Sequence, residues 1–401
     1  MLRRLRKSDL QIGMFVAKYG QGTPDSPFVP VGKPLLSLKT VDTLVPSDVD
    51  EVLIDETLTI RILNKLHRQR AEAEAQAQAQ AEKESQGPLV PLAEEMPVAE
   101  KLYTEALDHA HGFMADVRKG KDVDYREAEP VVDGFIESVF RNEAAAATLF
   151  KLRRFDEYSY THCLNVGVLA IILGKYLGLD KDVLRLLGLA GMFHDVGKAR
   201  IPEDILNKPA RLTTREMDII KTHPAESYKI ISATAGPNPE ILRGAIEHHE
   251  RYDGTGYPRG LAGGKIGTFG RIVSIVDVYD ALTSKRCYKD AMPTAKALSL
   301  MYQWRDSNFA PNSIEHFIKC IGVYPIGSFV RLSNGEHAIV IANNEANAAR
   351  PTVKIVFDAR MRTKTPTVVD LFATAGEGGL EVRDCLNPAG YPVDLARLLM
   401  A

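Results

Sequence analysis

The stretch that decides the fold is His194-Asp195-Val196-Gly197-Lys198, because it combines a helical setting with adjacent imidazole and carboxylate groups. It lies within a region, about Pro97 to Ile321, where apolar residues recur at helical spacing almost throughout. Gly and Pro separate the helical segments, and one long loop runs from Gly254 to Gly264. The pattern predicts a mainly α protein with a helical bundle at its core.

The two ends of the chain follow other patterns. Up to about Leu66, short apolar runs punctuated by Gly and Pro predict a small domain with a few strands and one or two helices. Near the C-terminus, Phe329 to Leu332 and His337 to Ile341 flank an Asn-Gly turn, which predicts a β-hairpin because both turn residues tolerate positive φ. Val353 to Phe357 predicts a further strand.

We therefore expect four parts. They are a small α/β domain (residues 1–70), an Ala/Gln/Glu-rich linker (71–96), the helical core (97–323) and a small β-rich module (324–401). The linker is expected to be either a solvated helix or disordered. A coiled coil is disfavoured because no large apolar residue repeats along it.

Composition excludes several classes of function. The formal net charge of −2 provides no global basic field for duplex DNA or an anionic membrane. The four cysteines lie far apart in the sequence, which disfavours a thiolate zinc site and indicates free thiols in a reducing compartment: Cys163, Cys287, Cys320 and Cys385. The basic N-terminus is not followed by an apolar segment, and the most apolar run, Val166 to Leu179, is too short to span a bilayer. We expect a cytoplasmic protein.

Histidines and aspartates concentrate in the helical core. The candidates are His162, His194, Asp195, His223, His248, His249 and Asp277. Imidazoles and carboxylates without thiolates suit a moderately hard divalent ion, so Fe or Mn is favoured over Zn. Neighbours on a helix point about 100° apart, so adjacent ligands such as His194 and Asp195 suit a site wider than one ion. Two ions ~3.5–4 Å apart can activate a hydroxide and clamp a phosphoryl group, which predicts phosphate ester hydrolysis.

Each signal also has an ordinary explanation. A His-Asp pair arises by chance, His223 before Pro224 could end a helix, and His248-His249 could be a surface pair. Asp277 is harder to explain in this way, because it lies in an apolar stretch and a buried carboxylate needs partners. Taken jointly, the set favours a metal site.

Three motifs make the prediction specific. His194 to Lys198 resembles the signature of the HD phosphohydrolase superfamily. The run from His248 to Pro258, HHERYDGTGYP, is similar to the motif that names the HD-GYP subfamily, and Asp277 to Leu282 matches the segment that follows it there. The resemblance implies an all-helical catalytic core and cyclic di-GMP as substrate.

The resemblance also implies roles for individual residues. All seven histidines and aspartates above would be metal ligands, with Asp195 bridging two ions. Lys198 would bind the scissile phosphate and stabilise developing charge while a metal-bridging hydroxide attacks. The implied substrate contacts are Lys198, Gly256, Tyr257, Pro258, Asp280, Lys285, Arg286 and Lys289. For Tyr257, a structural and a catalytic role are both open.

The sequence departs from the family in two places. Where the family has Arg-Pro-Tyr-Arg, this chain has Arg286-Cys287-Tyr288-Lys289, and a lysine lacks the planar fork of an arginine. Members with a third metal carry Glu four residues before the first ligand histidine, and this chain has Tyr158 there. We therefore expect two metals.

The segment from Leu5 to Glu56 looks like the uncharacterised N-terminal domain that often precedes HD-GYP cores, with a regulatory or packing role. The loop containing Gly256, Tyr257 and Pro258 is a candidate contact for GGDEF-type or other signalling proteins, and a homodimer is left open. The expected products are pGpG and, after a second step, GMP. The alternatives are hydrolysis of another nucleotide or cyclic dinucleotide, and a catalytically silent receptor for cyclic di-GMP.

Overall fold

The computed structural model describes residues 2–11, 14–20, 27–35, 41–55, 58, 89–121, 124–152, 158–234, 236–284, 291–344, 346–374, 376, 378–386, 390–391 and 393–400. The chain divides into two compact units, residues 1–87 and 88–401. Most of the expected linker lies outside the described residues. Within them, no helix combines the length and the apolar character needed to cross a lipid bilayer.

The N-terminal unit is built on an antiparallel sheet of four strands in the order β1-β4-β2-β3. The strands are β1 (Leu2–Arg6), β2 (Phe15–Tyr19), β3 (Val29–Pro34) and β4 (Glu51–Asp55), and the short helix α1 (Val41–Leu44) precedes β4. Alternate residues of β4, Val52 and Ile54, are buried, as expected for a strand with one face on a core. They pack with Val16, Leu35 and Val45.

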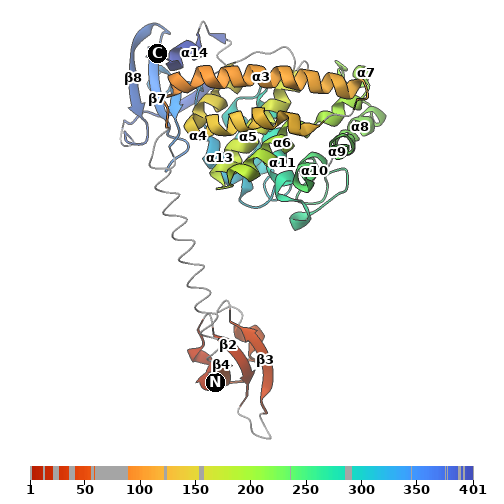
Figure 1. Ribbon diagram of the computed structural model, residues 1–401. Helices are drawn as coiled ribbons and strands as arrows, with labels where there is room; N and C mark the ends of the chain where they lie inside the picture. Colours follow the sequence, from red (N-terminus) through yellow and green to blue (C-terminus); the bar gives the residue numbers. More distant parts are fainter. Residues whose placement is uncertain are drawn as a thin grey trace. The chain divides into compact units, whose positions relative to one another are not determined.

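The helices of the second unit form a bundle, which confirms the mainly α prediction. Its helices are α3 (Leu92–Arg118), α4 (Glu129–Leu152), α5 (Tyr158–Tyr176), α6 (Lys181–Phe193), α7 (Glu203–Leu206), α8 (Thr214–Ile220), α9 (His223–Ser232), α10 (Pro239–Glu247), α11 (Thr268–Thr283), α12 (Thr294–Gln303) and α13 (Ser313–Ile321), with 3-10 turns η3 (Tyr125–Ala128), η4 (Val196–Arg200) and η5 (Gly263–Lys265). α3 runs alongside α4 and α5 (Figure 1). α5 is surrounded by other helices, and its residues 162–173 are buried without interruption.

Glycines let α5 and α6 approach closely. A Cβ on Gly191 of α6 would lie 2.7 Å from the Cα of Gly167 of α5, nearer than real side chains come to backbone. Only hydrogen fits between the two helices at this crossing. The close contact holds His162 of α5 and His194, which follows α6, in neighbouring positions, with their ring centroids 5.3 Å apart.

α3 begins at Leu92, before Pro97, where the sequence pattern placed the start of the helical core. Pro97 therefore lies inside α3 and does not mark its start. The preceding turn is held by Glu95, which is 1% exposed and accepts hydrogen bonds from Ser138 (2.7 Å) and Arg141 (2.7 and 2.9 Å) of α4.

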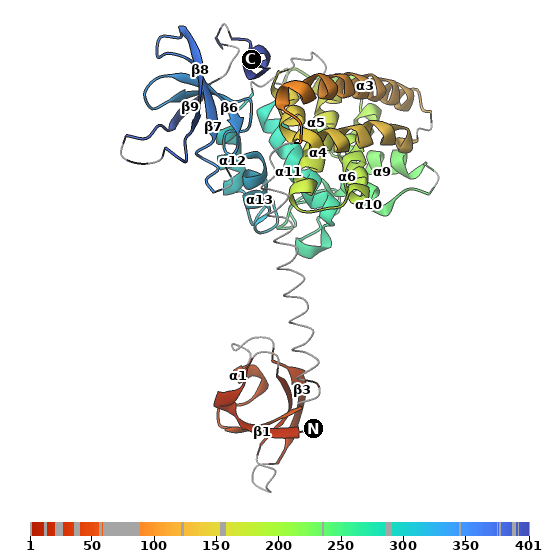
Figure 2. The ribbon, with the colours of Figure 1, turned by 60° about the vertical axis from the view of Figure 1, so that its left-hand side comes forward.

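The C-terminal module is an antiparallel sheet in the order β8-β7-β6-β5-β9 (Figure 2). Its strands are β5 (Phe329–Leu332), β6 (His337–Ala342), β7 (Thr352–Phe357), β8 (Thr363–Asp370) and β9 (Val382–Leu386). The expected β-hairpin is confirmed, since β5 and β6 pair with Val330 opposite Ala338. β8 is an exposed edge strand that contains Pro366, and helix α14 (Leu395–Met400) covers part of the sheet.

Candidate metal centre

The bundle gathers all seven predicted metal ligands into one place. They come from five positions: His162 in α5, His194 and Asp195 directly after α6, His223 at the start of α9, His248 and His249 directly after α10, and Asp277 in α11. Six are buried, and His249 is partly exposed. Five of them lie at helix ends, where the chain turns and a side chain can be aimed independently of the helix face.

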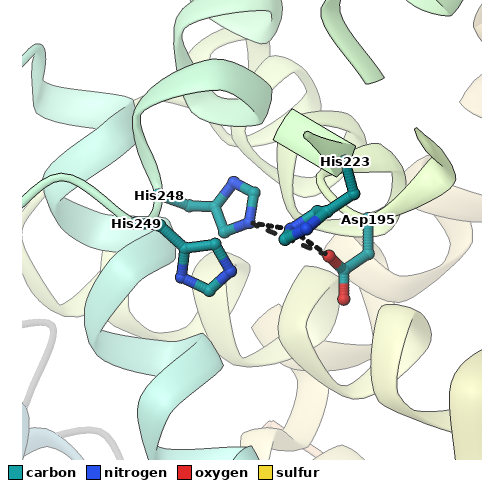
Figure 3. A group of neighbouring side chains, drawn as sticks. All are labelled: Asp195, His223, His248 and His249. Atoms are coloured by element: carbon teal, nitrogen blue, oxygen red, sulfur yellow. Dashed lines mark hydrogen bonds and ion pairs between the residues drawn. The ribbon is translucent and has the colours of Figure 1, made fainter. Parts of the chain in front are cut away.

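The ligands form two groups that could each hold an ion. One group is Asp195, His223, His248 and His249, and the other is His162, His194 and Asp277; within each, the potential ligand atoms lie within 4.8 Å of one another. Figure 3 shows the first group, with the ring of His223 between His248 and Asp195. Nε2 of His223 lies 3.1 Å from Oδ1 of Asp195, and Nε2 of His248 lies 3.8 Å from the same oxygen.

Asp195 faces both groups. Its Oδ1 points to His223 and His248, and its Oδ2 lies 3.5 Å from Nε2 of His162 and 3.3 Å from Nε2 of His194. Each oxygen of one carboxylate is thus directed at a different set of imidazoles. His194 and Asp195 fall in separate groups, although both follow the last residue of α6.

His248 and His249 do not separate in this way, because both belong to the first group. The helix α10 ends at Glu247, and the two histidines lie in the turn that follows. Their ring centroids are 4.1 Å apart. The expectation of separate helix faces fails here because the residues are no longer helical.

Main-chain carbonyls fix the orientation of three rings. Nδ1 of His194, His223 and His248 each donates to the carbonyl three residues earlier, on Gly191 (2.6 Å), Ile220 (2.7 Å) and Ala245 (2.7 Å). With the proton held on Nδ1, Nε2 presents its lone pair to the site, which is the tautomer a metal requires. Nδ1 of His162 is held by a carboxylate instead, that of Asp280, at 2.7 Å.

The donor set fits divalent ions. Among the described buried atoms, Nε2 of His194 and Oδ1 of Asp195 take part in no hydrogen bond, although both are directed into the site. Unsatisfied buried polar atoms are rare in folded proteins because each costs about 1–3 kcal/mol. Divalent ions bound by this cluster would satisfy both atoms.

The pKa shifts favour the ligand-competent forms of most groups. Burial opposes ionisation of Asp195, but the neighbouring His194 and Lys198 outweigh burial and hold the pKa of Asp195 well below its usual value. Burial, reinforced by the neighbouring histidines, holds the pKa of His248 well below its usual value and lowers that of His249 to about 3. These groups are therefore neutral imidazoles and an ionised carboxylate at neutral pH, as metal ligands must be.

His162 differs in this respect. Its burial disfavours the charged ring, but Asp195, Asp277 and Asp280 outweigh burial and raise its pKa well above the usual value. The carboxylates that attract a proton to His162 are the same groups that attract a cation to the site. Binding of an ion at Nε2 would displace this proton, so metal uptake releases a proton here.

Lys198 lies at the site, but not by the helical spacing expected from His194. The chain leaves α6 at His194, and Lys198 belongs to the 3-10 turn η4, from which its Nζ contacts Oδ2 of Asp195. Burial disfavours the ammonium, but Asp195 outweighs it and raises the pKa of Lys198 above its usual value. Lys198 is therefore a cation directed at the central carboxylate.

The Gly-Tyr-Pro loop forms a wall beside His249. The ring of Tyr257 lies 4.7 Å from that of His249, and the Tyr257 N–H donates to the His249 carbonyl (3.1 Å). A Cβ on Gly256 would lie 2.3 Å from the amide nitrogen of Arg251, so only glycine fits there. Pro258 follows a cis peptide bond.

Glu250 fixes the backbone of the Gly-Tyr-Pro loop through hydrogen bonds. It is 2% exposed and accepts from the amides of Arg259 (2.8 Å) and Leu261 (2.9 Å). The third residue of the HHE run thus holds the backbone of the loop, while the two histidines before it face the metal groups.

Other predicted substrate contacts do not line the site or are not described. Asp280 is 3% exposed and lies behind His162, with Oδ2 on His162 Nδ1 and Oδ1 accepting from Asn165 (2.8 Å) and Ser284 (3.0 Å). Asp280 was expected to contact the substrate, but both of its oxygens accept hydrogen bonds from protein groups and neither is presented to a substrate. Lys285, Arg286 and Lys289 lie outside the described residues, as does the side chain of Tyr158.

Sequence reasoning missed Asn165 and Tyr103, which continue the hydrogen bonds from Asp280. Asn165 lies three residues after His162, one turn along the same face of α5, and this spacing was the available signal. Tyr103 lies in α3, far from the motifs in sequence, and nothing in the sequence pointed to it.

Comparison with known families defines the class of this protein. The profile of the HD domain matches residues 145–312, which contain all seven ligands and Lys198. A domain of unknown function matches residues 2–128, and a KOW domain associated with HD domains matches residues 329–375. The chain is an HD-domain protein with one additional domain at each end of the catalytic core.

Sequence identity to known phosphodiesterases identifies the family within the HD-domain class. The chain is 35% identical over 373 residues to a cyclic di-GMP phosphodiesterase of Pseudomonas aeruginosa, covering 92% of this chain and 89% of the relative. It is 37% identical to the cyclic di-GMP phosphodiesterase response regulator RpfG of Xanthomonas campestris, over 44% of this chain and 48% of the relative. It is also 37% identical to 3′3′-cGAMP-specific phosphodiesterase 1 of Vibrio cholerae, over 36% of this chain and 34% of the relative. The chain belongs to the HD-GYP family of cyclic di-GMP phosphodiesterases.

Proposed function

We propose that this protein hydrolyses the 3′–5′ phosphodiester bonds of cyclic di-GMP with the help of two divalent metal ions. The expected first product is pGpG, and cleavage of the second bond would give GMP. The observation that carries the proposal is the position of Asp195, whose two oxygens face different sets of imidazoles. The relationship to the phosphodiesterase of Pseudomonas aeruginosa over nearly the whole chain supports the substrate.

The chain's own residues would hold the two ions in the two groups already described. His223, His248 and His249 would bind one ion, His162, His194 and Asp277 the other, and Asp195 would bridge them. Bound as a pair, the ions would supply a hydroxide at neutral pH and neutralise charge on the phosphoryl oxygens. A nitrogen and oxygen donor set without thiolate favours Fe or Mn.

Lys198 would bind the phosphate. It is a cation beside the bridging carboxylate, and its raised pKa keeps it protonated, so it acts through charge and not as a base. A cation aimed at the phosphoryl oxygens stabilises the charge that grows on them as the bond breaks. The remaining proposed substrate contacts are Gly256, Tyr257 and Pro258 in the loop, and Lys285, Arg286 and Lys289 after α11.

We also propose that the enzyme works in the cytoplasm and contacts other proteins there. Cys163 and Cys320 are buried free thiols, which is typical of the cytoplasm. The Gly-Tyr-Pro loop would be available for contact with a GGDEF-type or other signalling protein, and a homodimer is compatible with the proposal.

A second candidate substrate is 3′3′-cGAMP, because a relative with 37% identity is specific for it. The two substrates differ in one base, so the phosphate chemistry of the site serves both. Discrimination between them would depend on groups that contact the base.

The test is a direct comparison of the two substrates. Protein purified anaerobically is loaded with Mn²⁺ or Fe²⁺, its metal content is counted, and each cyclic dinucleotide is incubated with it and followed by chromatography. Formation of pGpG or GMP from cyclic di-GMP, at a higher kcat/KM than for 3′3′-cGAMP, supports the proposal. A reversed preference would favour the second candidate, and absence of product from a loaded two-metal site would leave a receptor.

A further inference from the structure

We propose that Tyr103, Asn165 and Asp280 form a buried hydrogen-bond chain that positions His162 for metal binding. Through this chain, the helix α3 would contribute to the affinity of the metal centre. The inference rests on the proposed function only in taking His162 as a metal ligand. It concerns residues that do not touch the metal or the substrate.

The hydrogen-bond chain is continuous from Tyr103 in α3 to His162, the proposed metal ligand. The hydroxyl of Tyr103 donates to Oδ1 of Asn165 (3.0 Å), and Nδ2 of Asn165 donates to Oδ1 of Asp280 (2.8 Å). Oδ2 of Asp280 then accepts from Nδ1 of His162 (2.7 Å). Four side chains from α3, α5 and α11 are thereby joined.

The direction of each hydrogen bond follows from the groups available. The oxygens of Asp280 serve as acceptors, the Asn165 amide donates to one of them, and His162 Nδ1 donates to the other. The other end of the amide, Oδ1 of Asn165, is an acceptor and so requires a donor, which the hydroxyl of Tyr103 supplies. The chain therefore keeps the proton of His162 on Nδ1 and leaves Nε2 for a metal.

Burial makes the chain energetically important. Tyr103 is 2% exposed, Asn165 5% and Asp280 3%, so water does not replace a lost partner. Hydrogen bonds in a low-dielectric interior are stronger, and losing a partner there costs more than at the surface. A carboxylate that orients a ligand histidine also raises its basicity, and disturbing such a group typically weakens metal binding.

His162 is the ligand that needs this chain. The other three buried histidines are held by the carbonyl three residues earlier, which moves only with the backbone. His162 lies in the interior of α5, where the carbonyls are used by the helix itself, so its Nδ1 is held by side chains. Its orientation can therefore change without any change in helix α5.

The hydrogen-bond chain joins two segments that match different domain families. His162, Asn165 and Asp280 lie in the segment matched by the HD domain, whereas Tyr103 lies in residues 2–128, matched by the domain of unknown function. The matched N-terminal segment thus reaches the metal centre through one hydroxyl group. A shift of α3 that broke the hydrogen bond of this hydroxyl would alter the orientation of His162.

The test measures metal binding without substrate, using Co²⁺ as the probe. Tyr103→Phe removes only the hydroxyl, and the matched control is Tyr125→Phe, another buried tyrosine, whose hydroxyl accepts from the Asn238 amide (3.1 Å) and not from a residue bonded to a ligand. We expect Tyr103→Phe to weaken Co²⁺ binding ~2–10-fold, the range of one hydrogen bond, and to shift the visible absorption of the bound Co²⁺. Tyr125→Phe should change neither.

Asp280→Asn provides a stronger disturbance. His162 and Asn165 donate to different oxygens of Asp280, and the substitution replaces one of these oxygens by an NH₂ donor. Either His162 then loses the acceptor for its Nδ1 proton, or the side-chain amide of Asn165 must flip. We expect Co²⁺ affinity to fall ~10–100-fold. Thermal unfolding of the metal-free variants, followed by circular dichroism, shows whether each variant is folded.

The outcomes separate this inference from the proposed function. Wild-type affinity and an unchanged Co²⁺ spectrum in folded Tyr103→Phe would overturn the inference, even if the enzyme cleaves cyclic di-GMP. Conversely, a wild-type protein that binds Co²⁺ but cleaves no cyclic dinucleotide would overturn the proposed function and leave the inference standing, provided that the two variants shift affinity as expected.

Discussion

Gly197 packs directly against the backbone of His223: a Cβ at Gly197 would lie 2.1 Å from the His223 carbonyl oxygen. The Gly197 amide also donates to Oγ of Ser227 in α9 (2.8 Å). The turn that carries Asp195 and Lys198 is therefore seated on the helix that begins with His223. The glycine of the HD motif serves this contact and not the chemistry.

Gly197→Ala should lower stability and metal content together. The added methyl group must push η4 away from α9, and overpacking of this kind costs ~1–3 kcal/mol. Thermal unfolding and metal counting of the purified protein measure the two effects. Gly264→Ala is the control, because a Cβ there meets nothing within 4 Å. Equal behaviour of the two variants would show that the backbone adjusts without cost.

Asp195→Ala should remove both ions and all activity while the helical fold survives. Each ion would lose one oxygen of the shared carboxylate, and the imidazoles would be left without a central negative charge. Metal counting and cyclic di-GMP hydrolysis test this, with circular dichroism as the check on folding. Asp204→Ala, on the exposed surface of α7, is the control. Retention of full activity by Asp195→Ala would contradict the bridging role.

Lys198→Ala should reduce kcat ~10²–10³-fold, the effect of losing one group that stabilises transition-state charge. Metal content should remain near that of the wild type, because Lys198 is not a ligand. Lys198→Arg should recover part of the activity through its charge. Lys229→Ala, which removes an exposed lysine paired with Glu226, is the control. Loss of metal in Lys198→Ala would instead assign the lysine to assembly of the site.

The pairing of Glu95 with Arg141 should make stability depend on pH. Burial opposes ionisation of Glu95, but hydrogen bonds from Arg141 and Ser138 outweigh it and lower its pKa below the ordinary 4.5. Because the folded-state pKa is depressed, the contribution is complete above about pH 4.5 and is lost as the pH falls through the folded-state value.

Glu95→Gln should lower the free energy of unfolding by ~1–3 kcal/mol at neutral pH, since Arg141 loses its charged partner. The difference from the wild type should shrink as the pH falls below 4.5, the ordinary pKa of this carboxyl group. Urea unfolding at several pH values measures it. Glu105→Gln, in the exposed pair with Lys101, should have little effect. A pH-independent difference would show that the charge of Glu95 is not what stabilises α3 against α4.

Much of the architecture could be predicted from local signals. Apolar periodicity indicated the helical core, and the Asn-Gly turn located the β5–β6 hairpin. The histidines and aspartates singled out as candidate ligands lie close together in the structure. These signals work because helix faces and turns are encoded by neighbouring residues.

What the sequence left undetermined depends on direction and tertiary contact. Asp280 lies three residues after Asp277, one turn along α11, yet it points behind His162 and not into the site. His248 and His249 share one group because α10 ends before them, and helix ends are set by local backbone that periodicity does not define. Tyr103 enters only through the packing of α3 on α5.

Pro366 has a consequence for the C-terminal sheet at high protein concentration. β8 is an exposed edge, and the open edge of a sheet can recruit a strand from another molecule and so start fibril growth. Proline has no amide hydrogen to offer, so the row of donors along β8 is interrupted near its middle. The strand that closes this side of the module thereby resists acting as a template for aggregation.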